Sequence, residues 1–142
     1  MTLEERLDGL VASFNRRLLD IPNGLLDRDA TFSLNGVPYE TFLGRDTDDP
    51  LARLIARGPA GYRFVAQALF YTLPKARVVF ELDGATLAAT ISLTGTLRGS
   101  EECFETNLAV RLTTGPGGAV VAADVSAEEA ALAQLRFARS TV

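Results

Sequence analysis

The chain has 142 residues, of which 47% are hydrophobic and 23% charged, with one cysteine and no histidine. This balance is typical of one ordered domain, so we expect a single domain over residues 1–142. The net charge of -4 and the pI near 4.8, with arginines scattered from Arg6 to Arg139, argue against a nucleic acid partner. One cysteine excludes an internal disulfide, and the lack of histidine excludes the usual zinc sites.

The N-terminal residues do not resemble a secretory signal, because acidic side chains at Glu4, Glu5 and Asp8 stand where basic ones are needed. No apolar run reaches the length that spans a membrane. We therefore expect a cytoplasmic protein with no membrane partner. Without histidine, an acid or base must be a carboxyl group with a shifted pKa, a tyrosine or the thiol of Cys103.

The first segment is predicted to be helical. Thr2 and Glu5 form a capping-box pattern, and apolar residues then recur at three- and four-residue steps over residues 3–19. After the break at residues 21–24, residues 25–27 fit one further helical turn.

A hairpin is expected next. Apolar residues alternate in residues 31–34, Asn35-Gly36 supplies the positive φ angles of a tight turn, and residues 37–39 resume an extended pattern. Asn35 is therefore interpreted as a turn residue rather than a ligand. The acidic run at residues 46–49 is interpreted as the start of a helix, with Asp49 as its cap and Pro50 as its first residue, rather than as a metal site.

The second half has the pattern of an antiparallel sheet. Runs rich in β-branched and aromatic residues alternate with turn residues such as Asp83-Gly84. The predicted strands cover residues 62–73, 76–82, 85–97, 102–113 and 119–125, of which the first two are open to interpretation as one bent strand. A closing helix is expected over residues 130–139.

One predicted strand bears on assembly. Residues 84–97, GATLAATISLTGTL, carry no charge, and the face formed by alternate Thr, Ser and Ala residues is small and neutral. An exposed sheet face normally carries charge. The sequence therefore predicts a homodimer that forms through the outer face of the sheet.

This order of elements resembles the nuclear transport factor 2-like superfamily, which includes ketosteroid isomerases, limonene epoxide hydrolases, scytalone dehydratases and SnoaL-like polyketide cyclases. The local carriers of the resemblance are residues 11–15, 29–32, 44–46, 82–85, 109–112 and 117–120. The resemblance implies an α+β fold in which a cone-shaped, bent, mixed sheet wraps around about three N-terminal helices, with a short C-terminal helix. It further implies a pocket for a small apolar molecule within the cone.

The catalytic groups of two of these families are missing. By the resemblance, the base of ketosteroid isomerases falls on Leu34 and their oxyanion-hole tyrosine on Leu10. Scytalone dehydratase chemistry needs histidine, which the chain lacks. The epoxide hydrolase pattern, a relay of carboxylate and arginine, leaves Glu105, Arg111 and Asn107 as the candidate catalytic residues, because they alternate along one predicted strand. A surface ladder of ion pairs is the alternative interpretation.

The ligand-binding residues expected from the pattern are aromatic or apolar: Phe14, Leu34, Tyr39, Tyr62 and Tyr71. We expect a small hydrophobic ligand, no cofactor and no metal. The first functional hypothesis is a SnoaL-like cyclase, isomerase or hydrolase of polyketide- or terpenoid-like substrates in bacterial secondary metabolism. The alternatives are a non-catalytic dimeric module for ligand binding or protein interaction, and a structural dimer whose cone is filled by side chains.

Overall fold

A computed structural model describes residues 2–42, 50–100 and 102–133. Its helices are α1 (Leu3–Asn15), α2 (Tyr39–Phe42), α3 (Pro50–Ala56) and α4 (Gly58–Thr72), and residues 129–133 are also helical. Its strands are β1 (Leu26–Leu34), β2 (Val37–Pro38), β3 (Arg77–Asp83), β4 (Ala88–Thr96), β5 (Cys103–Thr114) and β6 (Val120–Ser126).

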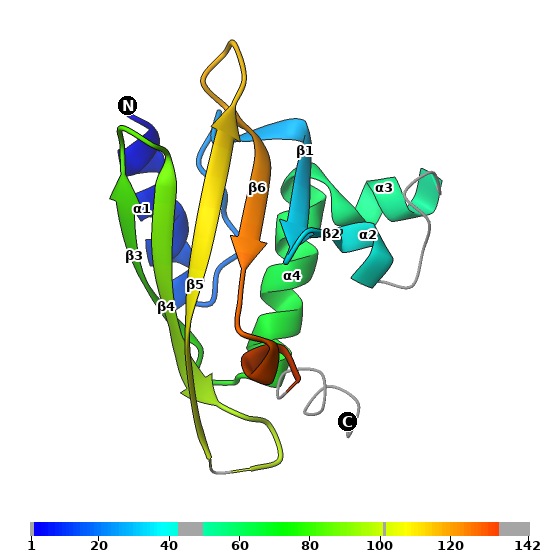
Figure 1. The fold of residues 1–142 in the computed structure, drawn as a ribbon, viewed down its shortest axis with the longest axis vertical. Coiled ribbons are helices and arrows are strands. Elements are labelled where there is room, and N and C mark those ends of the chain that lie inside the picture. Colours follow the sequence, from blue (N-terminus) through cyan, green and yellow to red (C-terminus); the bar gives the residue numbers. More distant parts are fainter. Residues whose placement is uncertain (1, 43–49, 101, 134–142) are drawn as a thin grey trace.

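The strands form one open sheet in the order β2-β1-β6-β5-β4-β3. All neighbours are antiparallel except β1 and β6, which run parallel, so the sheet is mixed as predicted. Figure 1 shows α1 behind β3 and β4, and α4 behind β1 and β6, on the same side of the sheet. The described helices thus leave the opposite face, called here the outer face, uncovered. This arrangement confirms the predicted α+β class.

The first helix begins as predicted and ends earlier. The Thr2 hydroxyl accepts a hydrogen bond from the Glu5 backbone N–H, and the Glu5 carboxylate accepts one from the Thr2 backbone, which completes the capping box. The helix ends at Asn15 because Arg17 adopts a positive φ of 62°, which a continuing α-helix does not allow. The Asn15 side chain then binds the edge of the sheet: its amide donates to the Val78 carbonyl oxygen, and its oxygen accepts from the Val78 N–H.

The predicted strand over residues 62–73 is wrong, since this segment belongs to the 15-residue helix α4. Pro59 lies in its first turn, where the missing N–H costs nothing. Its half-buried and buried apolar residues include positions 62, 65, 66, 69 and 70, at helical spacing, and the buried cap residue Leu73 continues this stripe. The interpretation of residues 62–82 as one bent strand is therefore also wrong. The remaining strand predictions are confirmed to within a few residues.

The hairpin is confirmed. Asn35 and Gly36 both have positive φ, 51° and 80°, as a two-residue turn of this type requires. The helical turn expected over residues 25–27 is wrong, because Leu26 already pairs with Val120 of β6. The start of α3 at Pro50 is as predicted, whereas Asp49, the rest of the acidic run and the end of the closing helix lie outside the described residues.

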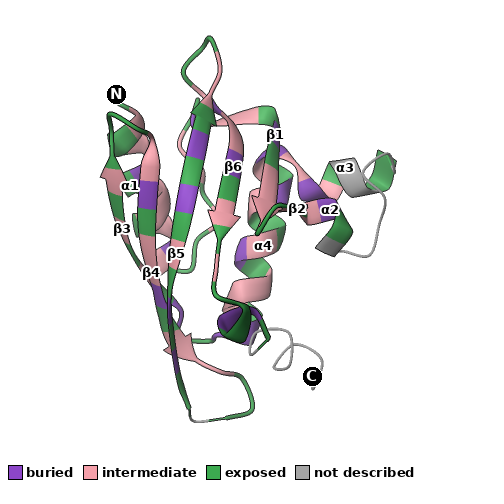
Figure 2. Cartoon of the chain, viewed as in Figure 1, coloured by how far each residue is buried: buried purple, intermediate pink, exposed green. Residues whose placement is uncertain are grey.

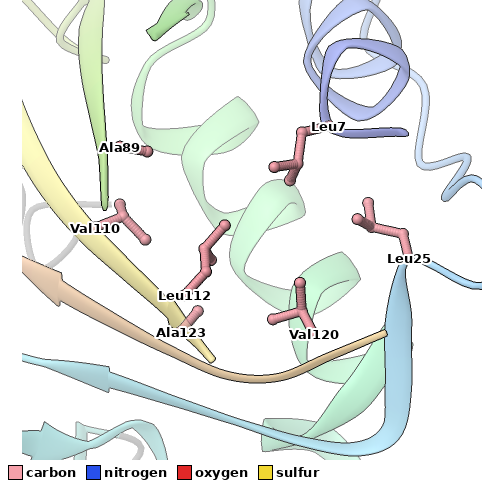
Figure 3. Packing of buried hydrophobic residues seen from close by; sticks show 7 residues of the cluster. All are labelled: Leu7, Leu25, Ala89, Val110, Leu112, Val120 and Ala123. Carbon is pink, nitrogen blue, oxygen red and sulfur yellow. The ribbon is translucent and has the colours of Figure 1, made fainter. Parts of the chain in front are cut away.

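Two apolar clusters fill the space between the helices and the sheet. The first cluster joins α1 to the sheet, and its side chains point toward one another in Figure 3: Leu7, Leu25, Ala89, Val110, Leu112, Val120 and Ala123. The second cluster joins α1 and α4 to the other end of β4 and β5: Phe14, Ala66, Leu73, Ala76, Leu93, Phe104 and Ala131. Along β5 the buried residues alternate with exposed ones, as Figure 2 shows. The alternation fixes which β5 side chains face the helices.

Candidate functional site

The second cluster is a part of the interior where a buried hydroxyl group borders apolar side chains. Phe14 from α1 is buried, and its ring packs against Phe70 of α4 at a centroid distance of 4.8 Å. Leu93 and Phe104 close the cluster from the sheet side. Alanine at position 66 keeps the facing side of α4 small. The cluster is thus lined by the rings of Phe14, Phe70 and Phe104, together with aliphatic and short side chains.

Tyr62 reaches this cluster from α4. It is half-buried and packs against the cluster, and burial raises its pKa from the ordinary 10.0 to about 12. Burial has this effect because it disfavours the charged phenolate. Within the described part of the chain, no hydrogen bond to the Tyr62 hydroxyl is formed. Tyr62 therefore presents a neutral hydroxyl group with an open capacity to donate a hydrogen bond.

Thr106 borders the same cluster from β5. Its side chain lies on the inner face of the sheet with Phe104, and its cross-strand neighbour is Leu93. The residue is only 7% exposed, and its Oγ1 has no hydrogen-bond partner within the described residues. A buried hydroxyl without a partner costs about 1–3 kcal/mol of desolvation. A buried hydroxyl group of this kind needs a hydrogen-bond partner, and an atom of a bound ligand would supply one.

Of the five residues expected to bind a ligand, two lie at this cluster and three lie elsewhere, where Leu34 and Tyr39 are half-buried and Tyr71 is exposed. Phe14 and Tyr62 meet at the second cluster. Tyr39 lies at the start of α2, with its ring in an edge contact 6.4 Å from that of Phe64, and Leu34 ends β1. Tyr71 is 43% exposed at the end of α4.

The ring of Tyr71 lies against the positively charged side chain of Arg98. The Arg98 guanidinium lies 4.1 Å from the centroid of its ring, and Arg98 Nε donates to the Tyr71 carbonyl oxygen. Its place in ligand binding stays a prediction, as do those of Leu34 and Tyr39.

The candidate catalytic residues share one face of β5, and it is the outer face. Glu105, Asn107 and Arg111 are all exposed, while Thr106 and Val110 between them point inward. Asn107 Oδ1 accepts a hydrogen bond of 2.9 Å from the Ser92 hydroxyl. Arg111 pairs in register with Asp124, whose Oδ1 accepts a 2.6 Å hydrogen bond from Ser33. The relay predicted across these strands thus lies where water has access, and its catalytic role stays a prediction.

This outer face is hollowed. A groove of about 620 Å³ runs over β3, β4, β5 and β6, and Glu81, Asp83, Arg111 and Asp124 supply its charged lining. A second groove of about 280 Å³ adjoins it and shares Thr90 and Ala109. Both hollows exist because the side chains at their floor are short.

A buried ion pair escaped the sequence analysis. Glu40 of α2 is 3% exposed, and its Oε1 accepts a 2.9 Å hydrogen bond from Arg57 Nε. The pair joins α2 to the residue that caps α4. The two residues are 17 positions apart in the sequence, so no local sequence pattern indicates that they pair. Breaking one side of such a pair leaves an uncompensated buried charge, so its evident role is to fix α2 against α4.

Other chemistry finds little support in the described residues. None of the helices there is long and apolar enough to cross a membrane. No group of three or more potential metal-ligating side chains gathers in residues 2–42, 50–100 and 102–133. Cys103 is exposed at the start of β5.

Together, these features define a class: a small α+β protein in which an open mixed sheet curves over helices on one face and encloses an apolar interior with isolated hydroxyl groups. The chain has the fold of the nuclear transport factor 2-like superfamily, which confirms the resemblance drawn from its sequence.

Similarity to solved structures supports this assignment of the fold. IdmH from Streptomyces antibioticus, a proposed polyketide cyclase, is 18% identical with a TM-score of 0.65 over 96% of this chain and 99% of its own. AclR from Streptomyces galilaeus, a proposed hydroxylase, is 14% identical with a TM-score of 0.61 over 94% and 84%. An NTF2-like protein of unknown function from Exiguobacterium sp. 255-15 is 14% identical with a TM-score of 0.58 over 91% and 99%. No family model and no curated protein matches the sequence.

Proposed function

We propose that the protein binds a small, uncharged and largely apolar molecule at the second cluster, between α1, α4 and the inner face of β4 and β5. The observation that carries this proposal is the Thr106 hydroxyl, which is buried and has no partner in the described chain. Tyr62 supports it from α4, where it packs against the cluster and its hydroxyl forms no hydrogen bond within the described residues. Sites for small molecules commonly combine apolar walls with a few placed polar groups.

The chemistry of the two hydroxyl groups narrows the ligand. A tyrosine with a pKa near 12 stays neutral at physiological pH, and threonine does not ionise, so neither compensates a charge on the ligand. Burying an uncompensated charge among apolar side chains is costly. The ligand is therefore neutral, and it carries a carbonyl, ether or hydroxyl oxygen that accepts a hydrogen bond.

The similar solved structures support a narrower proposal for the class of ligand. Because IdmH is described as a proposed polyketide cyclase and has the same fold, polyketide- or terpenoid-like molecules are the ligand class to test first. AclR, with the same fold, is described as a proposed hydroxylase, so the fold alone leaves the reaction open. Exposure of Glu105 and Arg111 on the outer face favours the binding module over catalysis by these residues.

Native mass spectrometry tests the binding role. The protein purified from its own host is recorded under gentle conditions and again after denaturation. The proposal expects a non-covalent adduct, lost on denaturation, whose released compound is neutral and apolar. It fails if the protein carries no adduct and also takes up no neutral polyketide or terpenoid from a test panel.

Catalysis is tested separately with the compound so identified. The Glu105→Gln variant keeps the size of the side chain and removes its charge. If the variant folds and turns the compound over as fast as the parent protein, Glu105 has no catalytic role. A loss of turnover with binding retained would support the enzyme hypothesis.

A further inference from the structure

The exposed side of α4 carries a distinct set of residues. It includes Arg63, Phe64, Gln67 and Tyr71, whose spacing of three and four places them on one stripe of the helix. The buried stripe of α4 packs toward the sheet, so this exposed stripe faces away from it, on the far side of the molecule in Figure 1. Phe64 is 36% exposed and Tyr71 43%. The stripe therefore combines apolar rings with a basic and a polar group.

The segment that follows α1 lies beside this stripe. Arg63 Nε donates a hydrogen bond to the carbonyl oxygen of Leu19, which holds the segment against α4. Leu18, the residue before it, is 45% exposed, and Arg16 is exposed as well. The segment thus adds an apolar and a basic side chain to the same region of the surface.

Two further arginines are held at the C-terminal end of α4. The Arg17 guanidinium lies 5.5 Å from the centroid of the Phe70 ring, and its Nη1 donates to the Ala76 carbonyl oxygen. Arg98 packs on the Tyr71 ring and donates through Nε to the Tyr71 carbonyl oxygen. These contacts hold both side chains in place without neutralising them, because a carbonyl group carries no net charge.

The basic side chains of this region keep their charge. Within the part of the chain that the structure describes, none of them forms an ion pair with a carboxylate. The exposed cations are Arg16, Arg17, Arg63, Lys75 and Arg98. The acidic side chains described in the adjoining segments are Asp20 and Glu102, which leaves a surplus of three positive charges. These cations, Leu18 and the exposed stripe of α4 are together called here the α4 surface.

The charge of the whole chain is divided unevenly. Residues 50–80 contain five basic side chains and no acidic one, so the remaining residues carry 9 basic and 18 acidic side chains. At physiological ionic strength, charges more than about 8 Å away are largely screened. A partner at the α4 surface therefore meets a positive region, although the net charge of the chain is -4.

We propose that the α4 surface docks on a lipid bilayer with anionic headgroups. Arg63 and Arg98 are held through Nε, which leaves their Nη N–H groups available to phosphate oxygens. Leu18 and Tyr71 lie among these cations. Aliphatic and aromatic side chains of this kind enter the boundary between the headgroups and the acyl chains of a bilayer. The α4 surface thus fits a partner that presents phosphate groups next to hydrocarbon.

Such a contact lies on the membrane and does not cross it. The sequence-based expectation of no membrane partner rested on the lack of a spanning apolar run, which a surface contact does not need. Each Lys or Arg side chain near an anionic bilayer raises partitioning by a factor of about five. A surplus of three charges therefore gives weak, reversible binding that salt reduces.

The proposal does not depend on ligand binding at the second cluster. If that cluster does take a neutral apolar molecule, docking through α4 would bring the site to the bilayer, where such molecules dissolve. An acidic protein is the other partner that the charge would attract. The apolar side chains are interspersed with cations instead of forming one patch, and a fluid bilayer adapts to this pattern more readily than a fixed protein surface.

Co-sedimentation with vesicles tests the proposal on the full chain. Vesicles of phosphatidylcholine and phosphatidylglycerol in equal amounts are compared with vesicles of phosphatidylcholine alone, at about 0.05 M and about 0.5 M NaCl. The variants are Gln67→Glu, which adds a negative charge in the middle of the stripe, Lys75→Gln and Leu18→Ser. Gly117→Glu is the matched control: it adds the same charge in the loop between β5 and β6, where a Cβ meets no atom within 4 Å.

The parent protein and Gly117→Glu should sediment with the anionic vesicles at low salt and be released at high salt. Gln67→Glu and Lys75→Gln should each lower the partition coefficient about five-fold. Leu18→Ser should lower it by about the same factor, because it removes the apolar contact of a side chain that is 45% exposed. Circular dichroism establishes that each variant is folded before it is compared.

Three results would overturn the proposal. The first is a parent protein that stays in solution with the anionic vesicles; if it then bound poly-glutamate, the α4 surface would belong to an acidic protein partner. The second is equal binding to both kinds of vesicle. The third is folded Gln67→Glu and Lys75→Gln variants that bind as tightly as Gly117→Glu.

Discussion

Replacing Thr106 by valine should separate stability from ligand binding. Valine has nearly the same shape as threonine and lacks the hydroxyl group that is buried without a partner among the described residues. Removing an unsatisfied buried hydroxyl saves about 1–2 kcal/mol of desolvation, so the ligand-free variant should be more stable than the parent protein. For a domain of this size, the gain corresponds to a rise in Tm of about 3–6 °C.

The same substitution should weaken ligand binding. Losing one neutral hydrogen bond costs about 0.5–1.5 kcal/mol, which is about a 2- to 10-fold rise in Kd. Urea denaturation of the ligand-free protein gives the first quantity, and titration with the compound identified by mass spectrometry gives the second. Thr106→Ser is the matched control, because it keeps the hydroxyl and removes only a methyl group.

A lower stability of ligand-free Thr106→Val would refute the reasoning. That result would mean that the hydroxyl forms a hydrogen bond in the native protein and is not held open for a ligand. An unchanged Kd would separate Thr106 from the binding site even if the variant were more stable.

Three further changes test particular contacts. Because burial raises the pKa of Tyr62, its stabilising contribution is complete below pH 10 and is lost as the pH rises toward 12. Over this range the free energy of unfolding, measured by urea denaturation, should therefore fall by about 1–2 kcal/mol less in Tyr62→Phe than in the parent protein. Asn35→Gly should keep the turn and still lower the free energy of unfolding by about 1–2 kcal/mol, because the Asn35 side chain exchanges two hydrogen bonds with the Ala127 backbone. Gly61→Ala should cost more than about 2 kcal/mol, because its Cβ would lie 2.6 Å from the carbonyl group of Ala56, whereas Gly117→Ala, which meets no atom within 4 Å, should be nearly neutral.

Each of these has a clear contrary outcome. Equal loss of stability above pH 10 in the parent protein and in Tyr62→Phe would mean that this tyrosine titrates normally. An Asn35→Gly variant as stable as the parent protein would mean that Asn35 stabilises the turn only through its backbone conformation. Equal stabilities of the two glycine variants would contradict the close approach of α4 to the segment before it.

The strand order of the second half could be read from local signals, because each hairpin is marked by turn residues and each strand by alternation. Residues 62–73 were predicted to form a strand because aromatic and β-branched side chains favour strands. Their apolar residues recur at three- and four-residue steps, however, and this spacing fits a helix. Spacing prevailed here since these residues bury one stripe against the sheet. The helical turn predicted over residues 25–27 failed for another reason: Leu26 belongs to β1 and is held extended by a parallel partner far along the chain, Val120, which no local pattern indicates.

The candidate site was predicted in part. Phe14 and Tyr62 were expected from their aromatic character, and the structure brings both to the second cluster. Thr106 escaped notice because threonine is common on strands, and its lack of a hydrogen-bond partner is a property of the folded interior. Glu105, Asn107 and Arg111 were correctly placed on one face of a strand. Alternation cannot tell which of the two faces the helices cover.

The location of a bound ligand tests the central claim most directly. With the compound found by mass spectrometry, or with the neutral apolar dye Nile red as a probe, intermolecular nuclear Overhauser effects identify the protons that lie next to it. The account predicts contacts from the ligand to the Thr106 methyl group and to the Tyr62 and Phe104 rings. Contacts to the Val79 methyl groups on the outer face, with none to Thr106 or Tyr62, would contradict it.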